Sequence, residues 1–352
     1  MYKKRIISFS QAINEALFLS MNRDKNVLLM GLGIDDPKSI FETTKGLNKF
    51  FSNNRVFDMP TSENSMTGFA IGLAISGKRP IVTHQRVEFS LLAMDQIINQ
   101  AAKWLYMSAG KKSVPLVIRL IIGRGWGQGP QHSQSLESIF AHIPGLKVVC
   151  PSDPHNAKGL LISSIEDNNP VIFFEHRWCH GMKGDVSKKS YKIPIGKSRY
   201  VSKGKDLTIV TFSYMVTEAL RVNQILLDNN IKCEIIDLQS LRPLDKEKFL
   251  KSAKKTRNII VIDNGLMCYG ISAEILAIIS ENLKEKNYKI MRVGVADTPI
   301  PSTVALAKYS YPNQSSIIKA IEKMLKKKIK IAKAYKTNTI HDKPNASFMG
   351  PF

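Results

Sequence analysis

Short apolar runs and longer mixed segments alternate along the chain. The runs have the length of a strand, whereas apolar residues in the mixed segments return every three or four positions. The apolar runs in the first half are residues 27–31, 56–59, 80–84, 114–122, 146–150 and 171–175. Those in the second half are residues 207–212, 233–238, 259–263 and 290–295. Runs that are apolar on both sides suit parallel sheets covered by helices, so the pattern predicts an α/β protein with doubly wound sheets.

The mixed segments predict helices between these strands. Ser8 and Gln11 have the spacing of a capping box, in which two side chains satisfy backbone N–H groups of the first turn. The helix that they open carries Ala12, Ile13, Ala16, Leu17 and Leu19 on its apolar side. We expect further helices after Glu63, over residues 88–107 and 218–227, after Gly270, and over residues 315–325.

Length and composition divide the chain into two domains. At 352 residues it exceeds the usual size of one domain. Glycine and lysine become frequent between Arg177 and Lys205, which indicates a polar, flexible connection. We expect a first domain over residues 1–182, a linker over 183–204, a second domain over 205–328, and a basic, irregular tail over 329–352.

The formal net charge of +22 could indicate a nucleic-acid-binding protein. The lysines are spread over the whole length, however, and basic residues do not interleave with aromatic ones. We therefore expect lysine-rich, solvated surfaces and no nucleic-acid partner.

Other bulk features indicate a cytoplasmic protein. No apolar run approaches the roughly 18 residues that a membrane span needs. The basic start of the chain precedes an apolar stretch too short for a signal peptide. The four cysteines are scattered, without the spacing of metal ligands or of a secreted disulfide framework.

Glu63 is the carboxylate whose surroundings are most unusual. It lies between the second apolar run and a segment in which Gly68, Ala70, Gly72 and Ala74 alternate with larger apolar residues. These small residues would form a helix face on which another element can pack closely. Two interpretations stay open: a helix-start residue favoured by the helix dipole, or a desolvated carboxyl group used for proton transfer.

Three polar segments directly follow predicted strands. They are Glu63 with its neighbours, residues 84–89, and the loop that contains His132. Ligands of doubly wound proteins bind beyond the carboxyl ends of the parallel strands. We therefore expect the three segments to converge at one edge of the first sheet.

The order of short motifs along residues 8–326 resembles that of one family. The motifs are TSEN around Glu63, FSLLAMDQIINQAAKWLYMSAG from Phe89, VPLVIR from Val114, GPQHSQS around His132, HIPGLKVVCPSDPHNAKGL from His142, IEDNNPVIFFEH from Ile165, IDLQSLRPLD from Ile236 and GISAEI from Gly270. Each motif is weak alone, but together they are specific. The chain resembles the beta subunit of the thiamine-diphosphate-dependent decarboxylase component of 2-oxo acid (pyruvate or branched-chain) dehydrogenases, in the transketolase-like superfamily.

The resemblance implies a transketolase-like pyrimidine-binding domain followed by a transketolase C-terminal domain. Glu63 would hydrogen-bond a ring nitrogen of the cofactor's aminopyrimidine and support proton transfer there. Phe89 would contact the pyrimidine ring, although its position also suits a core helix residue, and Gln85 lies in the segment that lines the cofactor. His132 matches the family's active-site histidine, suited to proton delivery at neutral pH. The alternative is a loop histidine held by its neighbours in the sequence.

The resemblance also implies a structural potassium site. The residues that match its ligands, largely through backbone carbonyl oxygens, are Leu116, Ser164, Ile165, Asp167 and Asn169. The alternative is a capped helix end at which two adjacent asparagines turn the chain.

The half of the cofactor site that holds the diphosphate is absent from the sequence. Enzymes of this superfamily bind the diphosphate and Mg²⁺ through a GDG sequence followed by an NN pair. The chain has no GDG, and Asn53-Asn54 and Asn229-Asn230 lack such a partner. The resemblance therefore implies an alpha subunit that carries the GDG-NN motif and most Mg²⁺ ligands, in a heterotetramer of two alpha and two beta subunits.

Residues 83–88 depart from the acidic-aromatic segment of the family's dehydrogenases. Arg86, within them, could meet a carboxylate or a phosphate of a ligand, or pair with Glu88. The first functional interpretation is a decarboxylase of a pyruvate-like 2-oxo acid, with a lipoyl acyltransferase as one acceptor of the acyl unit. The second is a split transketolase or an acyloin-forming enzyme of sugar or secondary biosynthesis. Retention of Glu63 and His132 argues against a non-catalytic scaffold.

Overall fold

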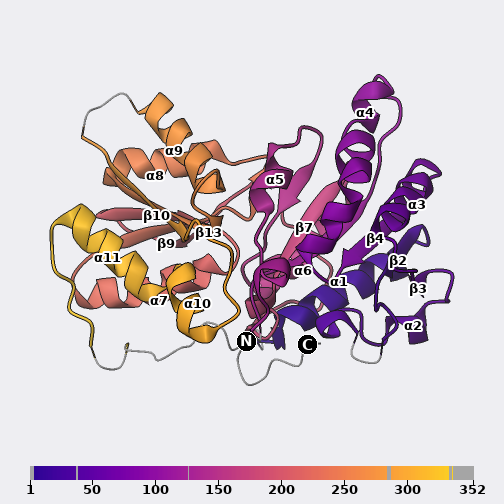
Figure 1. Cartoon of the computed structure of the whole chain (residues 1–352), viewed down its shortest axis with the longest axis horizontal. Helices are drawn as coiled ribbons and strands as arrows, with labels where there is room; N and C mark the ends of the chain where they lie inside the picture. The colour runs from indigo at the N-terminus through magenta and orange to yellow at the C-terminus, as the bar shows by residue number, and fades with distance from the viewer. Residues whose placement is uncertain (1–3, 37–38, 126, 284–286, 333–334, 336–352) are drawn as a thin grey trace.

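Two α/β domains lie side by side in the computed structural model (Figure 1), which describes residues 4–36, 39–125, 127–283, 287–332 and 335. The first domain is built on a seven-stranded sheet and the second on a five-stranded sheet. The expected fold class, two doubly wound domains in sequence, is confirmed.

The seven-stranded sheet has the order β12-β6-β7-β5-β4-β2-β3. Its parallel strands are β2 (Val27–Gly31), β3 (Val56–Asp58), β4 (Arg79–His84), β5 (Val117–Ile122), β6 (Lys147–Val149) and β7 (Val171–His176). The edge strand β12 (Ser240–Arg242) comes from the second half of the chain and runs antiparallel to β6. The second domain therefore contributes a strand to the sheet of the first.

Helices cover both faces of this sheet. On one face, α1 (Phe9–Arg23) packs against α6 (Pro154–Glu166), and α1 begins with the predicted capping box of Ser8 and Gln11. On the other face lie α3 (Glu63–Ile75) and the segments that follow β4. Two short helices, α2 (Leu47–Phe50) and α5 (Glu137–His142), complete the domain.

The single helix predicted over residues 88–107 is wrong. The segment forms a 3₁₀ helix η2 (Val87–Ala93), a π-helical turn η3 (Gln96–Ala101) and a short α4 (Trp104–Met107). In η2, Ser90 Oγ donates to Val87 O at 2.6 Å, a local bond that suits a tight turn. In η3, Ala102 N donates to Ile97 O at 3.0 Å, which makes one turn wider than an α-helix. The periodicity of apolar residues does not distinguish the 3₁₀ helix or the π-helical turn from an α-helix.

The second sheet has the order β14-β13-β10-β11-β9. Parallel strands β10 (Leu207–Thr211), β11 (Cys233–Asp237), β13 (Asn258–Leu266) and β14 (Lys289–Val295) match the predicted runs, and β9 (Arg199–Ser202) joins antiparallel. Helices α7 (Met215–Asp228) and α11 (Gln314–Leu325) cover one face, and α8 (Lys246–Thr256) and α9 (Ile271–Asn282) the other, with α10 (Val304–Ser310) before α11 (Figure 1).

The connection between the domains is more ordered than its glycine and lysine content suggests. Its first strand, β8 (Lys183–Asp185), pairs with β1 (Ile6–Ser8), and its last, β9, joins the second sheet. The start of the predicted tail packs on the second domain, where Ile329 is buried. Residues 333–334 and 336–352 of the tail lie outside the described residues.

Over the described ranges, no helix is both long enough and apolar enough to cross a membrane. All four cysteines are free thiols, and Cys150, Cys179 and Cys233 are buried.

Candidate active site

The topology brings the predicted site residues to one edge of the first sheet. Glu63 follows β3, Gln85 and Phe89 follow β4, and His132 follows β5 in a short 3₁₀ helix, η4 (Pro130–His132). These strands are parallel neighbours or next neighbours in the sheet, so their carboxyl ends share an edge. Helices η2 and η4 pack together there, and α3 packs against η2.

Glu63 is the first residue of α3 and is only 7% exposed. Its carboxylate accepts no hydrogen bond from the part of the chain that the structure describes. The predicted small-residue face is confirmed only in part: a Cβ on Gly68 would lie 3.3 Å from Gln96 Oε1, and Ala70 and Ala74 are buried, but Gly72 is exposed with nothing within 4 Å of its would-be Cβ. Since no described group donates to it, the carboxyl group of Glu63 is available to bond a ligand at the sheet edge.

Gln85 is anchored to the loop after β2. Its Nε2 donates to Leu32 O at 3.1 Å. Gly33 permits this approach, because its φ is +72° and a Cβ there would lie 2.6 Å from Gln85 Nε2. The loops after two neighbouring strands are thereby joined beside the candidate site.

Phe89 and His132 form one cluster. Their ring centroids are 5.6 Å apart in an edge-to-face arrangement, and Phe89 is half-buried. The Nδ1 atom of His132 is buried without a hydrogen-bond partner. Its neighbours bond elsewhere, since Ser133 Oγ donates to Gln128 O at 2.6 Å and Gln134 N donates to Glu88 Oε1 at 2.6 Å. The structure therefore does not support the alternative in which Ser133 and Gln134 hold the histidine in place.

Two charged residues of this edge, Glu88 and Arg177, were missed as site residues. Burial raises the pKa of Glu88, whereas the bond from Gln134 N and the charges of Arg86 and His132 lower it. The charges of Arg86 and Glu88 attract each other, but the two side chains form no ion pair within 4 Å in the described structure. Arg177 follows β7 directly, and a charged residue immediately after a buried strand was the available signal.

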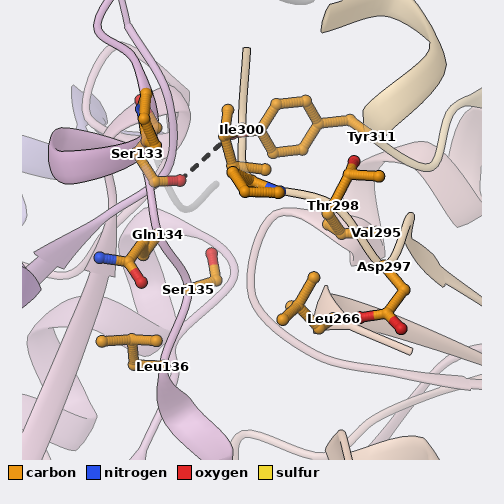
Figure 2. A pocket seen from close by; sticks show the side chains of 13 residues that line it. Ser133, Gln134, Ser135, Leu136, Leu266, Val295, Asp297, Thr298, Ile300 and Tyr311 are labelled. Atoms are coloured by element: carbon orange, nitrogen blue, oxygen red, sulfur yellow. Dashed lines mark hydrogen bonds between the residues drawn. The ribbon is translucent and has the colours of Figure 1, made fainter. Parts of the chain in front are cut away.

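A cavity of about 450 Å³ lies between the two domains, next to the loop of His132 (Figure 2). One wall is the segment 133–136, and the other contains Leu266, Val295, residues 297–300 and Tyr311. Tyr311 Oη donates to Ser133 O at 3.2 Å across the domain boundary. Sequence patterns did not indicate this cavity, because its walls are far apart along the chain and no site was expected in the second half.

The five residues of the predicted potassium site gather where α6 ends and β7 begins. Arg79 Nη1 donates to Ile165 O at 3.0 Å and to Asp167 O at 2.9 Å, and Val171 N donates to Leu116 O at 2.9 Å. Asn169 N donates to Asp167 Oδ1 at 2.9 Å. These bonds form a closed helix end, and an added ion would share two of its carbonyl oxygens with a guanidinium group.

The described part of the chain contains no group of three or more His, Cys, Asp or Glu side chains placed to hold a metal ion. Asn229, from one of the two asparagine pairs, ends α7 and donates to Ile225 O at 2.8 Å and Lys330 O at 2.9 Å. A site for Mg²⁺ built from acidic or histidine side chains is thus not found in these residues.

Comparisons with known proteins agree with this arrangement. Residues 5–179 match the family described as transketolase, pyrimidine binding domain, and residues 196–317 match transketolase, C-terminal domain. A solved structure described as a split gene transketolase, inactive beta4 tetramer, superimposes with a TM-score of 0.74 at 22% identity. That match covers 91% of this chain and 98% of the other. This likeness supports the fold.

Relatives of higher identity cover nearly the whole chain. The acetoin:2,6-dichlorophenolindophenol oxidoreductase subunit beta of Cupriavidus necator is 38% identical, over 92% of this chain and 98% of its own. The pyruvate dehydrogenase E1 component subunit beta of Rickettsia bellii is 38% identical, over 90% of this chain and 98% of its own. The subunit of the same name from Porphyra purpurea is 40% identical, over 89% of this chain and 95% of its own. The chain therefore belongs to the thiamine-diphosphate-dependent, transketolase-like family of pyruvate and acetoin dehydrogenase beta subunits.

Proposed function

We propose that the chain is the beta subunit of an enzyme that decarboxylates a pyruvate-like 2-oxo acid and transfers the remaining acyl or aldehyde unit. The observation that carries this proposal is the position of Glu63, 7% exposed at the start of α3, on the sheet edge that also holds Phe89 and His132. The relatives named as pyruvate and acetoin enzymes support the reaction class.

The residues present fit the pyrimidine half of thiamine diphosphate. The cofactor, when bound, supplies the electron sink for decarboxylation. Glu63 would hold a proton between its carboxyl oxygen and a ring nitrogen, at the end of α3 that packs against η2. Phe89 would flank the ring, and Gln85 would line it from the loop anchored at Leu32. At His132, the buried Nδ1 atom has no hydrogen-bond partner among the described residues.

The other half of the site would come from an alpha subunit with the GDG-NN motif, which would hold the diphosphate and most of the Mg²⁺ ligands. The relatives are themselves named beta subunits, which supports such a partner. Leu92 on η2 and Tyr106 and Met107 on α4 are large, exposed apolar side chains of the kind found at subunit interfaces. We infer a heterotetramer of two alpha and two beta subunits.

Three finer assignments stay predictions. A potassium ion at Leu116, Ser164, Ile165, Asp167 and Asn169 would share Ile165 O and Asp167 O with Arg79. The acceptor of the acyl unit would be a lipoyl acyltransferase. The location would be the cytoplasm, although one similar rice protein is named as mitochondrial.

A split transketolase is the weaker alternative. The likeness to a split gene transketolase is at 22% identity and supports only the fold, whereas the relatives at 38–40% are named as pyruvate and acetoin enzymes.

Glu63→Gln tests the proposal. The amide has nearly the same shape, but it cannot hold the negative charge that supports proton transfer. With the alpha subunit, saturating thiamine diphosphate and an artificial electron acceptor, we expect decarboxylation to fall on the order of a hundredfold or more. Glu166→Gln, at the end of α6, is the matched control and should keep full activity. Retention of more than about a tenth of the activity in Glu63→Gln would remove Glu63 from the mechanism.

A further inference from the structure

Two arginines are buried at the candidate site without a carboxylate partner. Arg86, between β4 and η2, is 9% exposed, and Arg177, after β7, is 1% exposed. Neither forms an ion pair in the described structure, and Arg86 Nη1 and Arg177 Nε are buried without a hydrogen-bond partner. Arginine is rarely buried unless its charge is paired, so these two call for a physical explanation.

Neutral contacts hold the guanidinium group of Arg177 in place. Its Nη1 donates to Gln128 Oε1 at 2.6 Å, and its Cζ lies 5.3 Å from the ring centroid of Phe41. The glycine-rich loop passes close over it, since a Cβ on Gly125 would lie 2.5 Å from Arg177 Nη1. The group is thus fixed in position, but its charge is not neutralised by these contacts.

The two arginines repel each other. Burial and the charge of Arg86 together lower the pKa of Arg177 to about 9, against the opposing effects of Glu88 and Tyr311. Burial also lowers the pKa of Arg86, against the attraction of Glu88. A single acidic group, Glu88, therefore lies near two guanidinium groups, which leaves an excess of positive charge in a desolvated place.

We propose that Arg86 and Arg177 form a subsite for an oxyanion of the substrate, a carboxylate or a phosphate group that is not lost in the reaction. Guanidinium groups bind both oxyanions through paired N–H donors, and an oxyanion would neutralise the excess charge. Binding the reacting carboxylate so strongly would stabilise the ground state and slow its loss as CO₂, so the group bound here is a second one. The identity of the substrate in this inference rests on the proposed function, whereas the existence of the anion site does not depend on it.

The binding test uses the full chain alone, without cofactor or alpha subunit. Its thermal unfolding midpoint is followed while inorganic phosphate, or acetate in a parallel series, is added at constant ionic strength. A ligand that binds only the folded state raises the midpoint in a saturable way, here by about 2–5 °C. The anion that saturates at lower concentration identifies the class of group, phosphate or carboxylate.

Arg86→Gln and Arg177→Gln should lose this rise. Arg23→Gln, the same change at an exposed arginine that pairs with Glu166, should keep it. If Arg177→Gln does not fold, Arg86→Gln decides the matter alone. An absence of any saturable rise in the wild-type chain, or an equal rise in Arg86→Gln, would overturn the proposal.

Turnover with the alpha subunit then assigns the subsite to the substrate. We expect Arg86→Gln to raise KM at least tenfold more for 2-oxo acids that carry a second carboxylate or a phosphate than for pyruvate. An equal effect on both would contradict a role in specificity. The two proposals fail separately, because anion binding is measured without turnover, whereas the Glu63→Gln assay measures turnover.

Discussion

Burial, more than sequence position, decides the chemistry of single acidic residues here. Glu137 begins α5 and is 2% exposed, with Asn264 Nδ2 donating to its Oε1 at 2.8 Å across the domain boundary. Burial raises its pKa to about 7, and the charge of Asp263 adds to the rise. The folded protein therefore holds this proton more tightly than the unfolded chain. The resulting stability is fully present below the ordinary carboxyl pKa and is lost as the pH rises through 7.

Glu137→Gln keeps the acceptor for Asn264 but cannot titrate. From pH 5 to pH 8 the wild type should lose stability relative to the variant. We expect the difference between their free energies of unfolding to change by about 2–3 kcal/mol in favour of the variant, because one pKa unit corresponds to about 1.4 kcal/mol. Denaturant unfolding at both pH values measures the change. Glu166→Gln gives the baseline for the same substitution at the surface. A difference that stays constant across this pH range would contradict a buried, titrating Glu137.

The site residues differ in how far the sequence predicts them. Glu63, Phe89 and His132 lie within family motifs, and the structure brings Phe89 and His132 into contact. Arg177 was read as the border of a linker, because its burial depends on the loop around Gly125 and on Phe41, which are distant in the sequence. Partners of this kind become visible only in the folded chain.

At the scale of elements, parallel central strands were predicted and edge strands were not. Strands such as β5 and β7 are buried along their whole length and are mostly apolar, with Arg119 of β5 paired to Glu175 of β7. By contrast, β1, β8, β9 and β12 are only three or four residues long, and each pairs with a strand far away or at a sheet edge. So short a segment has too few positions for its pattern to distinguish a strand from a turn.

A close approach between elements can be tested at Gly145, between α5 and β6. Its φ is +99°, and a Cβ there would lie 1.8 Å from Ala102 O, just after η3. Gly110 also has a positive φ, +78°, but nothing lies within 4 Å of its would-be Cβ. We expect Gly110→Ala to cost about 1 kcal/mol of stability from the backbone alone, and Gly145→Ala roughly 1–3 kcal/mol more from the clash.

Denaturant unfolding of the two glycine variants compares them directly. Gly110→Ala is the control for the backbone effect that both substitutions share. Equal stability loss in the two variants would mean that the segment after η3 yields easily at Ala102. The close contact between Gly145 and Ala102 would then not be what stabilises the broken helix over residues 87–107.

At the scale of the whole molecule, the two domains are joined by more than the connecting segment. Strand β12 extends the first sheet, and Asp237 Oδ2 accepts from Ser152 Oγ at 2.6 Å and from Arg199 Nε at 3.0 Å. The cavity of Figure 2 lies at the same boundary, beside the loop of His132. The candidate site is therefore positioned by both domains, although the predicted cofactor contacts all come from the first.

The central claim is that this chain supplies only the pyrimidine half of the cofactor site. Most of the charge of thiamine diphosphate lies on the diphosphate, which needs Mg²⁺ and fixed oxygen ligands. The scattered lysines attract it diffusely, and physiological salt screens them. Calorimetric titration with thiamine diphosphate and Mg²⁺ should therefore show at most weak binding to the isolated chain, and tight binding once the alpha subunit is added. Micromolar or tighter binding by the isolated chain, unchanged when Mg²⁺ is removed, would contradict the account.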